Sequence, residues 1–250
     1  MPPLEVDRVY VIHIRSGAED RAASIERQLG RLGIEFEYVL DGDVDDLTPE
    51  LLDRWFAGPM KQKHRNTSCC CKHLIAYSRI LRDGWRDALV LEDDIFLPDD
   101  FVSGLNASLR ELRARTDAGQ DAAFISLENS GLKQVPEAAP GTTLYRRAQG
   151  RETGAYWLSR AAAERFLAVA EGEKVSLRTP LFHATVVQSG AVDLWWRHPA
   201  IAEQGSVNGK FDSMLDPKRT GVMRRPRWLA RKSFQRWLRP VFDRLLGRTG

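Results

Sequence analysis

Ala88-Leu89-Val90-Leu91-Glu92-Asp93-Asp94 is the stretch of the sequence that decides the fold. Its first four residues are all apolar, which is typical of a strand that is buried on both faces of a sheet. Such a strand delivers the three carboxylates that follow it to the edge of the sheet. The stretch therefore predicts an α/β fold with acidic side chains at the end of a buried strand.

The N-terminal segment predicts the same kind of sheet. Residues 9–14 form an apolar run rich in β-branched side chains, residues 22–32 carry apolar residues at helical spacing, and residues 34–40 return to strand character. Strand, helix and strand in this order make the βαβ unit of a parallel sheet. Ligands of such sheets lie beyond the carboxyl end of the first strand, which draws attention to Arg15 and Arg21.

Two further segments matter for the site. Residues 43–66 are polar and irregular, and we interpret them as a mobile loop. A helix is predicted from about Ser68 to Arg82. Cys69, Cys70 and Cys71 are consecutive and lack the two-residue gaps of zinc sites and redox dithiols, so we interpret them as reduced thiols.

Composition sets the class of protein. The 250 residues are 43% apolar and 28% charged, which excludes a disordered chain and a disulfide miniprotein. Neither an export signal nor an apolar run long enough to span a membrane is readable, so we expect a cytoplasmic protein.

The net charge of +3 is unevenly distributed. Residues 222–250 hold nine basic residues and one acidic residue, and residues 1–221 therefore carry −5. Between Phe234 and Leu246, apolar side chains recur at helical spacing, with Pro240 interrupting them. We expect a basic amphipathic helical tail. It could attach to anionic lipid, dock on the protein's own core or a partner, or bind nucleic acid; the apolar stripe favours lipid and argues against nucleic acid.

Three adjacent carboxylates repel one another, and burying them is costly without compensating positive charge. Their hard oxygen atoms suit Mg²⁺ or Mn²⁺, which could neutralise a departing diphosphate. A solvated acidic turn would explain Glu92-Asp93-Asp94 equally well. An Mg²⁺-dependent phosphate-ester hydrolase would also need no more than this triplet.

Several motifs in a fixed order resemble glycosyltransferase family 25, which includes bacterial lipopolysaccharide galactosyltransferases. The resemblance covers about residues 8–211. The motifs are Val11-Ile12-His13-Ile14 leading to Arg21, the pair Cys69 and His73, the triplet Glu92-Asp93-Asp94, the segment Gly154-Ala155-Tyr156-Trp157-Leu158-Ser159, and Pro199 with Gln204.

The resemblance implies a GT-A-like nucleotide-sugar-binding fold, a metal-assisted transfer from a nucleotide sugar, and inversion at the anomeric carbon. Asp94 would be the first metal ligand, and Asp93 and Glu92 would bind metal, ribose or donor sugar. Arg21 would contact the nucleotide or its phosphates, Arg15 would lie near the same ligand, and Gln204 would line the donor site. His73 could touch substrate or only pack the helix, and Lys72 replaces the family's usual Ser.

An inverting transfer needs a base for the acceptor hydroxyl, and Glu128 and Glu152 are the candidates, with Glu128 slightly preferred. The family usually carries a Pro-x-Asp element after its alanine-rich helix, whereas residues 178–183 contain no acid here. His183 or Asp193 could substitute for it.

The sequence therefore predicts a GT-A-like domain over residues 1–221 and the basic tail over 222–250. We expect transfer of a hexose, galactose first, from a UDP-sugar to a lipid-linked glycan of lipopolysaccharide type, at the inner face of the cytoplasmic membrane. A non-catalytic family-25-like protein that binds glycan or nucleotide sugar is the alternative.

Overall fold

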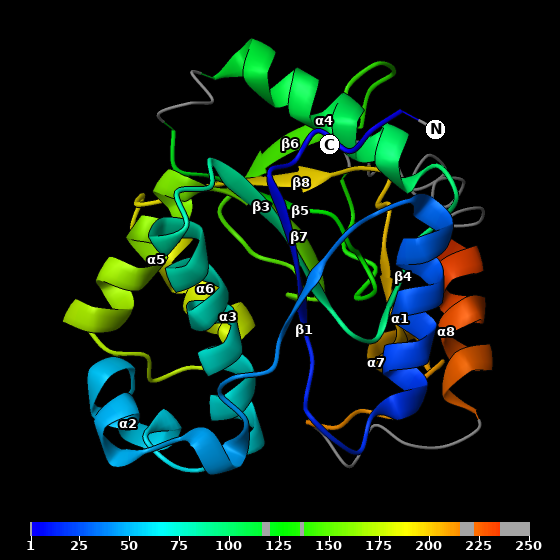
Figure 1. The fold of residues 1–250 in the computed structure, drawn as a ribbon. Coiled ribbons are helices and arrows are strands. Elements are labelled where there is room, and N and C mark those ends of the chain that lie inside the picture. Colours follow the sequence, from blue (N-terminus) through cyan, green and yellow to red (C-terminus); the bar gives the residue numbers. More distant parts are fainter. Residues whose placement is uncertain (1, 117–120, 136–137, 216–222, 236–250) are drawn as a thin grey trace, which may run out of the picture.

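The computed structural model describes residues 2–116, 121–135, 138–215 and 223–235. Within these residues, the core is a seven-stranded sheet of order β2-β1-β3-β7-β5-β8-β6 (Figure 1). Its strands are β1 (Arg8–Ile12), β2 (Glu37–Val39), β3 (Asp87–Glu92), β5 (Ala123–Ser126), β6 (Leu144–Arg147), β7 (Ala155–Ser159) and β8 (Asp193–Arg197). Two short strands, β4 (Ile95–Phe96) and β9 (Glu203–Gln204), form a separate antiparallel pair.

Five strands of the main sheet run in one direction. β1 is parallel to β2 and β3, and β5 is parallel to β8. β7 lies between β3 and β5 and is antiparallel to both, and β6 is antiparallel to β8 at the edge. The predicted α/β fold with a mostly parallel sheet is confirmed, with an inverted strand at its centre.

Helices cover both faces of the sheet (Figure 1). On one side lie α2, α3, α5 and α6, and on the other lie α1, α4 and α8. The helices are α1 (Glu19–Leu32), α2 (Pro49–Trp55), α3 (Arg65–Arg82), α4 (Phe101–Arg115), α5 (Arg160–Gly172), α6 (Thr179–Gln188), α7 (Gly205–Asn208) and α8 (Arg224–Ser233), with single 3₁₀ turns η1 (Val44–Asp46) and η2 (Gly58–Met60).

The strand β3 supplies both hydrophobic cores because successive side chains point to opposite faces. Ala88 and Val90 belong to the core under α3 and α5, and Leu89 and Leu91 belong to the core under α1 and α4. All four are fully buried, which explains why the run lacks polar residues.

The segment 43–66 is not the irregular loop that its composition suggested. Thr48 caps α2 by accepting a hydrogen bond from the amide of Leu51, and Trp55 and Phe56 are buried. The amide of Val175 donates to the carbonyl of Trp55 at 2.7 Å. The order of this segment comes from contacts with a distant part of the chain, which local polarity does not reveal.

The described part of the tail packs on the domain. Trp228 of α8 is 9% exposed, and its indole N–H donates to the carbonyl of Ser130 at 2.8 Å. Lys232 pairs with Glu203 of β9. Docking on the protein's own core therefore describes residues 223–235. The predicted apolar stripe beyond residue 235 lies outside the described residues. Among the residues described, no helix has the length and apolarity to cross a membrane.

Gly205 is needed where α7 approaches β4, because a Cβ there would lie 2.6 Å from the ring of Phe211 and 2.8 Å from the carbonyl oxygen of Asp94. We expect Gly205→Ala to lower the free energy of unfolding by about 1–3 kcal/mol. Gly30→Ala is the matched control, since Gly30 is exposed in α1 with open space around it. That change should raise stability by up to about 1 kcal/mol. Urea unfolding of both variants measures the difference, and equal effects would contradict the packing argument.

Candidate functional site

A cavity of about 400 Å³ lies at the carboxyl end of β3. Its wall combines the end of β3, the first turns of α3 and α6, the segment before β7, and β9 with α7. The charged and amide side chains that line it include Glu92, Lys133, Arg151, Glu152, Arg178 and Gln204. Three cationic and two anionic side chains thus surround one hollow at the edge of the sheet, where α/β proteins bind ligands.

Glu92 is the member of the acidic triplet that lines this cavity. Its Oε1 accepts a hydrogen bond from the hydroxyl of Thr153 at 3.0 Å, and its Oε2 accepts one from Nε2 of Gln204 at 2.7 Å. These contacts join two residues that the sequence had assigned to the donor site, Glu92 and Gln204. Both bonds use neutral donors, so the negative charge of Glu92 remains available to a cation.

His73 lies beside Glu92 but is fully buried. Its Nε2 is 3.6 Å from Oε1 of Glu92, and its Nδ1 is 2.7 Å from the hydroxyl of Tyr156. The chain of contacts continues from Tyr156 to the hydroxyl of Tyr77 at 2.7 Å and to Nε2 of His183 at 2.8 Å. Burial lowers the pKa of His183 well below its usual value, so this imidazole is neutral at pH 7.

Asp93 is outside the described lining of the cavity and is held by an imidazole and a guanidinium. His13 approaches its Oδ2 at 2.7 Å, and Arg21 donates to its Oδ1 at 3.1 Å. Arg21 also donates to the carbonyl of Asp212. His13 belongs to the sequence motif that leads to Arg21 but was not predicted as a site residue, although it directly follows Ile12, the residue of β1 that pairs with Glu92. Each carboxylate oxygen of Asp93 thus has a side-chain partner, and Asp93 is outside the described lining of the cavity.

Asp94 is 1% exposed, and its Oδ2 accepts a hydrogen bond from the amide of Ser206 at 2.9 Å. Its Oδ1 is buried and has no hydrogen-bond partner among the described residues. Burial, followed by the charge of Glu92, raises the pKa of Asp94 to about 6. An orphaned buried oxygen beside a second carboxylate fits one ligand position of a hard divalent cation.

The two candidate bases lie in different surroundings. Glu152 lines the cavity. Glu128 is fully buried, and its Oε2 accepts a hydrogen bond from the amide of Ser130 at 2.7 Å. Burial raises the pKa of Glu128 to about 7. Of the two residues considered as substitutes for the missing acid, His183 is buried in the tyrosine chain and Asp193 pairs with Arg146 on β6.

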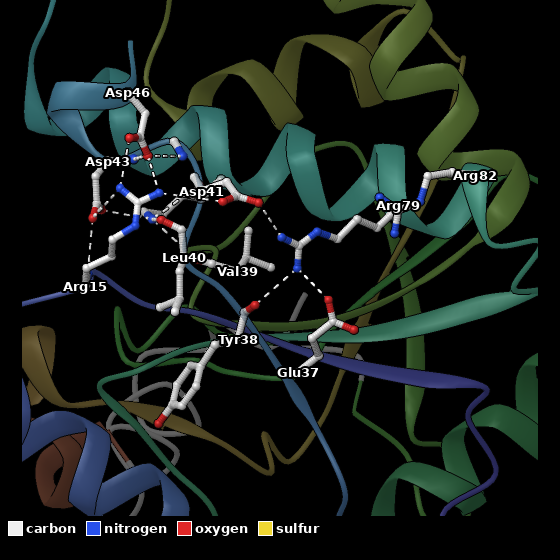
Figure 2. A network of polar contacts seen from close by, with 12 residues as sticks. Arg15, Glu37, Tyr38, Val39, Leu40, Asp41, Asp43, Asp46, Arg79 and Arg82 are labelled. Carbon is white, nitrogen blue, oxygen red and sulfur yellow. Dashed lines mark hydrogen bonds and ion pairs between the residues drawn. The ribbon is translucent and has the colours of Figure 1, made fainter.

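Arg15 belongs to a separate network beside the end of β1 (Figure 2). Its guanidinium donates to Asp46 at 2.8 Å and lies 3.6 Å from both Asp41 and Asp43. In the same network, the buried ammonium of Lys72 pairs with Asp43 at 2.9 Å and donates to the carbonyl of Leu40 at 2.7 Å. Lys72, which departs from the family pattern, therefore fixes the turn after β2, and Arg15 is outside the described lining of the cavity.

The sequence profile of glycosyltransferase family 25, described as a lipopolysaccharide biosynthesis protein, matches residues 6–177. The match spans more than half of the chain, and it includes α3, the acidic end of β3 and the segment before β7. This chain therefore belongs to glycosyltransferase family 25. A search of curated proteins gives no match.

Two solved structures are similar at a low level. One is the inositol-1-phosphate CTP transferase from T. maritima, with 11% identity, a TM-score of 0.37, and coverage of 92% of this chain and 98% of the other. The second is a glycosyltransferase involved in the glycosylation of the major capsid of PBCV-1, with 8% identity, a TM-score of 0.32, and coverage of 82% and 100%.

Glu128 predicts a distinctive dependence of stability on pH. Below pH 4.5 its carboxyl is neutral in both states. As the pH rises from 4.5 towards 7, the unfolded chain loses this proton and the folded chain keeps it, which lowers the free energy of unfolding by about 3 kcal/mol. We expect Glu128→Gln to remove this loss, so that the variant gains stability over the wild type at pH 8.

Urea unfolding at pH 5 and pH 8 measures the effect. Glu164→Gln, on the exposed face of α5, is the control and should leave the pH dependence unchanged. Asp94 adds a loss of its own over this range because its pKa is also raised, so the two variants are compared by difference. A loss of stability between pH 5 and pH 8 as large in Glu128→Gln as in the wild type would contradict the assignment.

Proposed function

We propose that this protein is an inverting transferase that moves a hexose, galactose first, from a UDP-sugar to a glycan of lipopolysaccharide type. The observation that carries the proposal is the cavity at the end of β3, where Glu92 and Gln204 meet inside a chain of family 25. The lining contains both signs of charge, as transfer from an anionic donor to a neutral hydroxyl requires.

The cationic side chains suit the diphosphate of such a donor. Lys133, Arg151 and Arg178 line the same cavity, and Arg178 is the N-cap of α6. Arg151 is held in place by stacking on Trp196, with its guanidinium carbon 4.3 Å from the ring centre. These groups would bind the donor and stabilise the charge of the departing UDP.

Among the two candidate bases, the geometry favours Glu152. A base must lie within hydrogen-bonding reach of the acceptor hydroxyl, and Glu152 lines the cavity whereas Glu128 is fully buried. We therefore assign proton removal to Glu152, and we assign Glu128 no contact with the substrates because it is buried outside the described lining of the cavity. This choice reverses the slight preference that followed from the sequence.

A divalent cation, Mn²⁺ or Mg²⁺, remains part of the proposal. Asp94 would hold it through Oδ1, the oxygen without a hydrogen-bond partner in the described chain. When bound, such an ion supplies positive charge close to the leaving diphosphate.

The helix α8 supports a proposal for both the glycan acceptor and the location of the protein. Leu229 of α8 is 43% exposed, and Phe234, directly after the helix, is 46% exposed. Arg227 and Arg231 are exposed on the same helix. Apolar and basic side chains exposed on one helix suit the surface of an anionic bilayer. We place the protein at the inner face of the cytoplasmic membrane, where a lipid-linked glycan would reach the cavity.

Release of UDP from several UDP-sugars, with and without Mn²⁺ and acceptor, tests the activity. We expect Glu152→Gln to lower kcat at least about a hundredfold with little change in donor affinity, because an amide cannot take the proton. Donor binding is followed separately by calorimetry. Glu128→Gln is the matched control.

Three results would contradict parts of this proposal. If Glu128→Gln, and not Glu152→Gln, abolishes transfer, Glu128 is the base. Donor binding without any release of UDP would support a binding protein instead. Phosphate release from simple esters in the absence of a sugar donor would support a hydrolase.

The membrane proposal predicts a loss of binding on charge reversal in α8. We expect Arg231→Glu to weaken sedimentation with phosphatidylglycerol vesicles about tenfold, because a basic residue near such a surface contributes about 1 kcal/mol and the new carboxylate is repelled. Arg165→Glu on α5 changes the charge equally on the other side of the molecule and should leave sedimentation unchanged. Equal losses in both variants would contradict a specific role of α8.

A further inference from the structure

Cys69, His73 and Glu92 bring a thiol, an imidazole and a carboxylate together at the inner end of the cavity. One ligand atom from each residue lies within 4.8 Å of the other two. Nε2 of His73 and Oε1 of Glu92 are 3.6 Å apart, which is close to the separation of two ligands around one zinc ion. From this juxtaposition we infer that the three residues bind a divalent transition metal of the zinc class.

The helix α3 prepares two of the three ligands. Cys69 and His73 are four residues apart, and residues at this spacing lie one above the other on the same face of a helix. Glu92 reaches them from the end of β3, which is parallel to β1 and fixed in register along its length. Rigid elements therefore hold all three donors, as a metal site requires. In the sequence, Cys69 and His73 stood out only as a motif shared with family 25, and the cysteines were judged as metal ligands only by their spacing from one another.

A second, independent observation is the unpartnered nitrogen of His73. The residue is fully buried, yet its Nε2 has no hydrogen-bond partner in the part of the chain that the structure describes. The opposite nitrogen, Nδ1, is engaged with the hydroxyl of Tyr156 at 2.7 Å. A buried ring nitrogen that faces a thiol and a carboxylate, with no hydrogen bond of its own, is satisfied by a metal ion.

The surrounding contacts match those of metal ligands. Histidine ligands usually donate their other N–H to an oxygen, which fixes the tautomer. With a metal on Nε2, Nδ1–H of His73 donates to Tyr156, Tyr156 donates to Tyr77, and Tyr77 donates to Nε2 of His183. Nε2 of His183 can accept the last hydrogen bond of this chain because the imidazole is neutral. Thr153 and Gln204 orient the carboxylate of Glu92 in the same way.

The type of metal follows from the donor set. A thiolate and an imidazole with one carboxylate suit Zn²⁺ or Co²⁺ and do not suit Mg²⁺, which prefers oxygen ligands. Three protein ligands leave one position of a tetrahedral ion open. Since Cys69 and Glu92 both line the cavity, that position faces the cavity. The site thus differs in chemistry from the hard-cation position at Asp94.

Cobalt provides a direct test with the full-length protein. After removal of bound metal with a chelator, we expect one Co²⁺ per chain to give the charge-transfer absorption of a cobalt–thiolate bond, and Zn²⁺ to displace it. Cys69→Ala should abolish this absorption. Cys70→Ala and Cys71→Ala are the matched controls, because both are buried cysteines of the same helix outside the cluster, and both should retain it.

A variant with a smaller change separates loss of metal binding from loss of the fold. Thr153→Val removes only the hydrogen bond to Glu92, and we expect it to weaken Zn²⁺ binding about tenfold while the circular dichroism spectrum stays unchanged. Absence of the cobalt–thiolate absorption in the wild type, or its persistence in Cys69→Ala, would overturn the inference, as would displacement of Co²⁺ by equimolar Mg²⁺. Binding is measured without nucleotide or sugar, so its failure is distinguishable from failure of the transferase.

Discussion

The negative charge at the end of β3 is the constraint on which the rest of the site depends. Three consecutive carboxylates follow a buried strand, and each contacts a different set of hydrogen-bonding or charged groups. His13 and Arg21 hold Asp93, the amide of Ser206 holds Asp94, and Thr153 with Gln204 holds Glu92. These partners come from the residue after β1, from α1, from the segment before β7, and from β9 with α7. The need to compensate one short acidic segment thus fixes how distant parts of the chain meet.

Much of the fold could be predicted from local pattern, because β3 carries an apolar run that only a doubly covered strand explains. The inverted direction of β7 could not be predicted, since Ala155–Ser159 are buried in the same way as a parallel strand would be. Trp55 and Phe56 were missed for a related reason. Their partner is Val175, and a contact between residues so far apart leaves no local signal.

The sequence pointed to several candidate site residues but not to the side chains that hydrogen-bond with them. Residue type and position drew attention to Glu92 and Arg21, and the resemblance to family 25 added Gln204. The structure brings Glu92 and Gln204 into direct contact. It separates Asp93 from them, because Asp93 turns towards His13. Charge alone could not rank Glu128 against Glu152, since burial decides which carboxylate lines the cavity. Burial is a property of the folded chain.

The contacts of α8 bear on how the site is made during synthesis. Ser206 and Gln204, which hold Asp94 and Glu92, come more than a hundred residues after β3, and α8 then closes over Glu203 through Lys232. During translation, the acidic end of β3 is synthesised before the groups that donate hydrogen bonds to Glu92 and Asp94. The nascent chain therefore carries the end of β3 without these later partners until Gln204 and Ser206 have emerged, and the lining of the cavity is complete only once Leu215 has followed them.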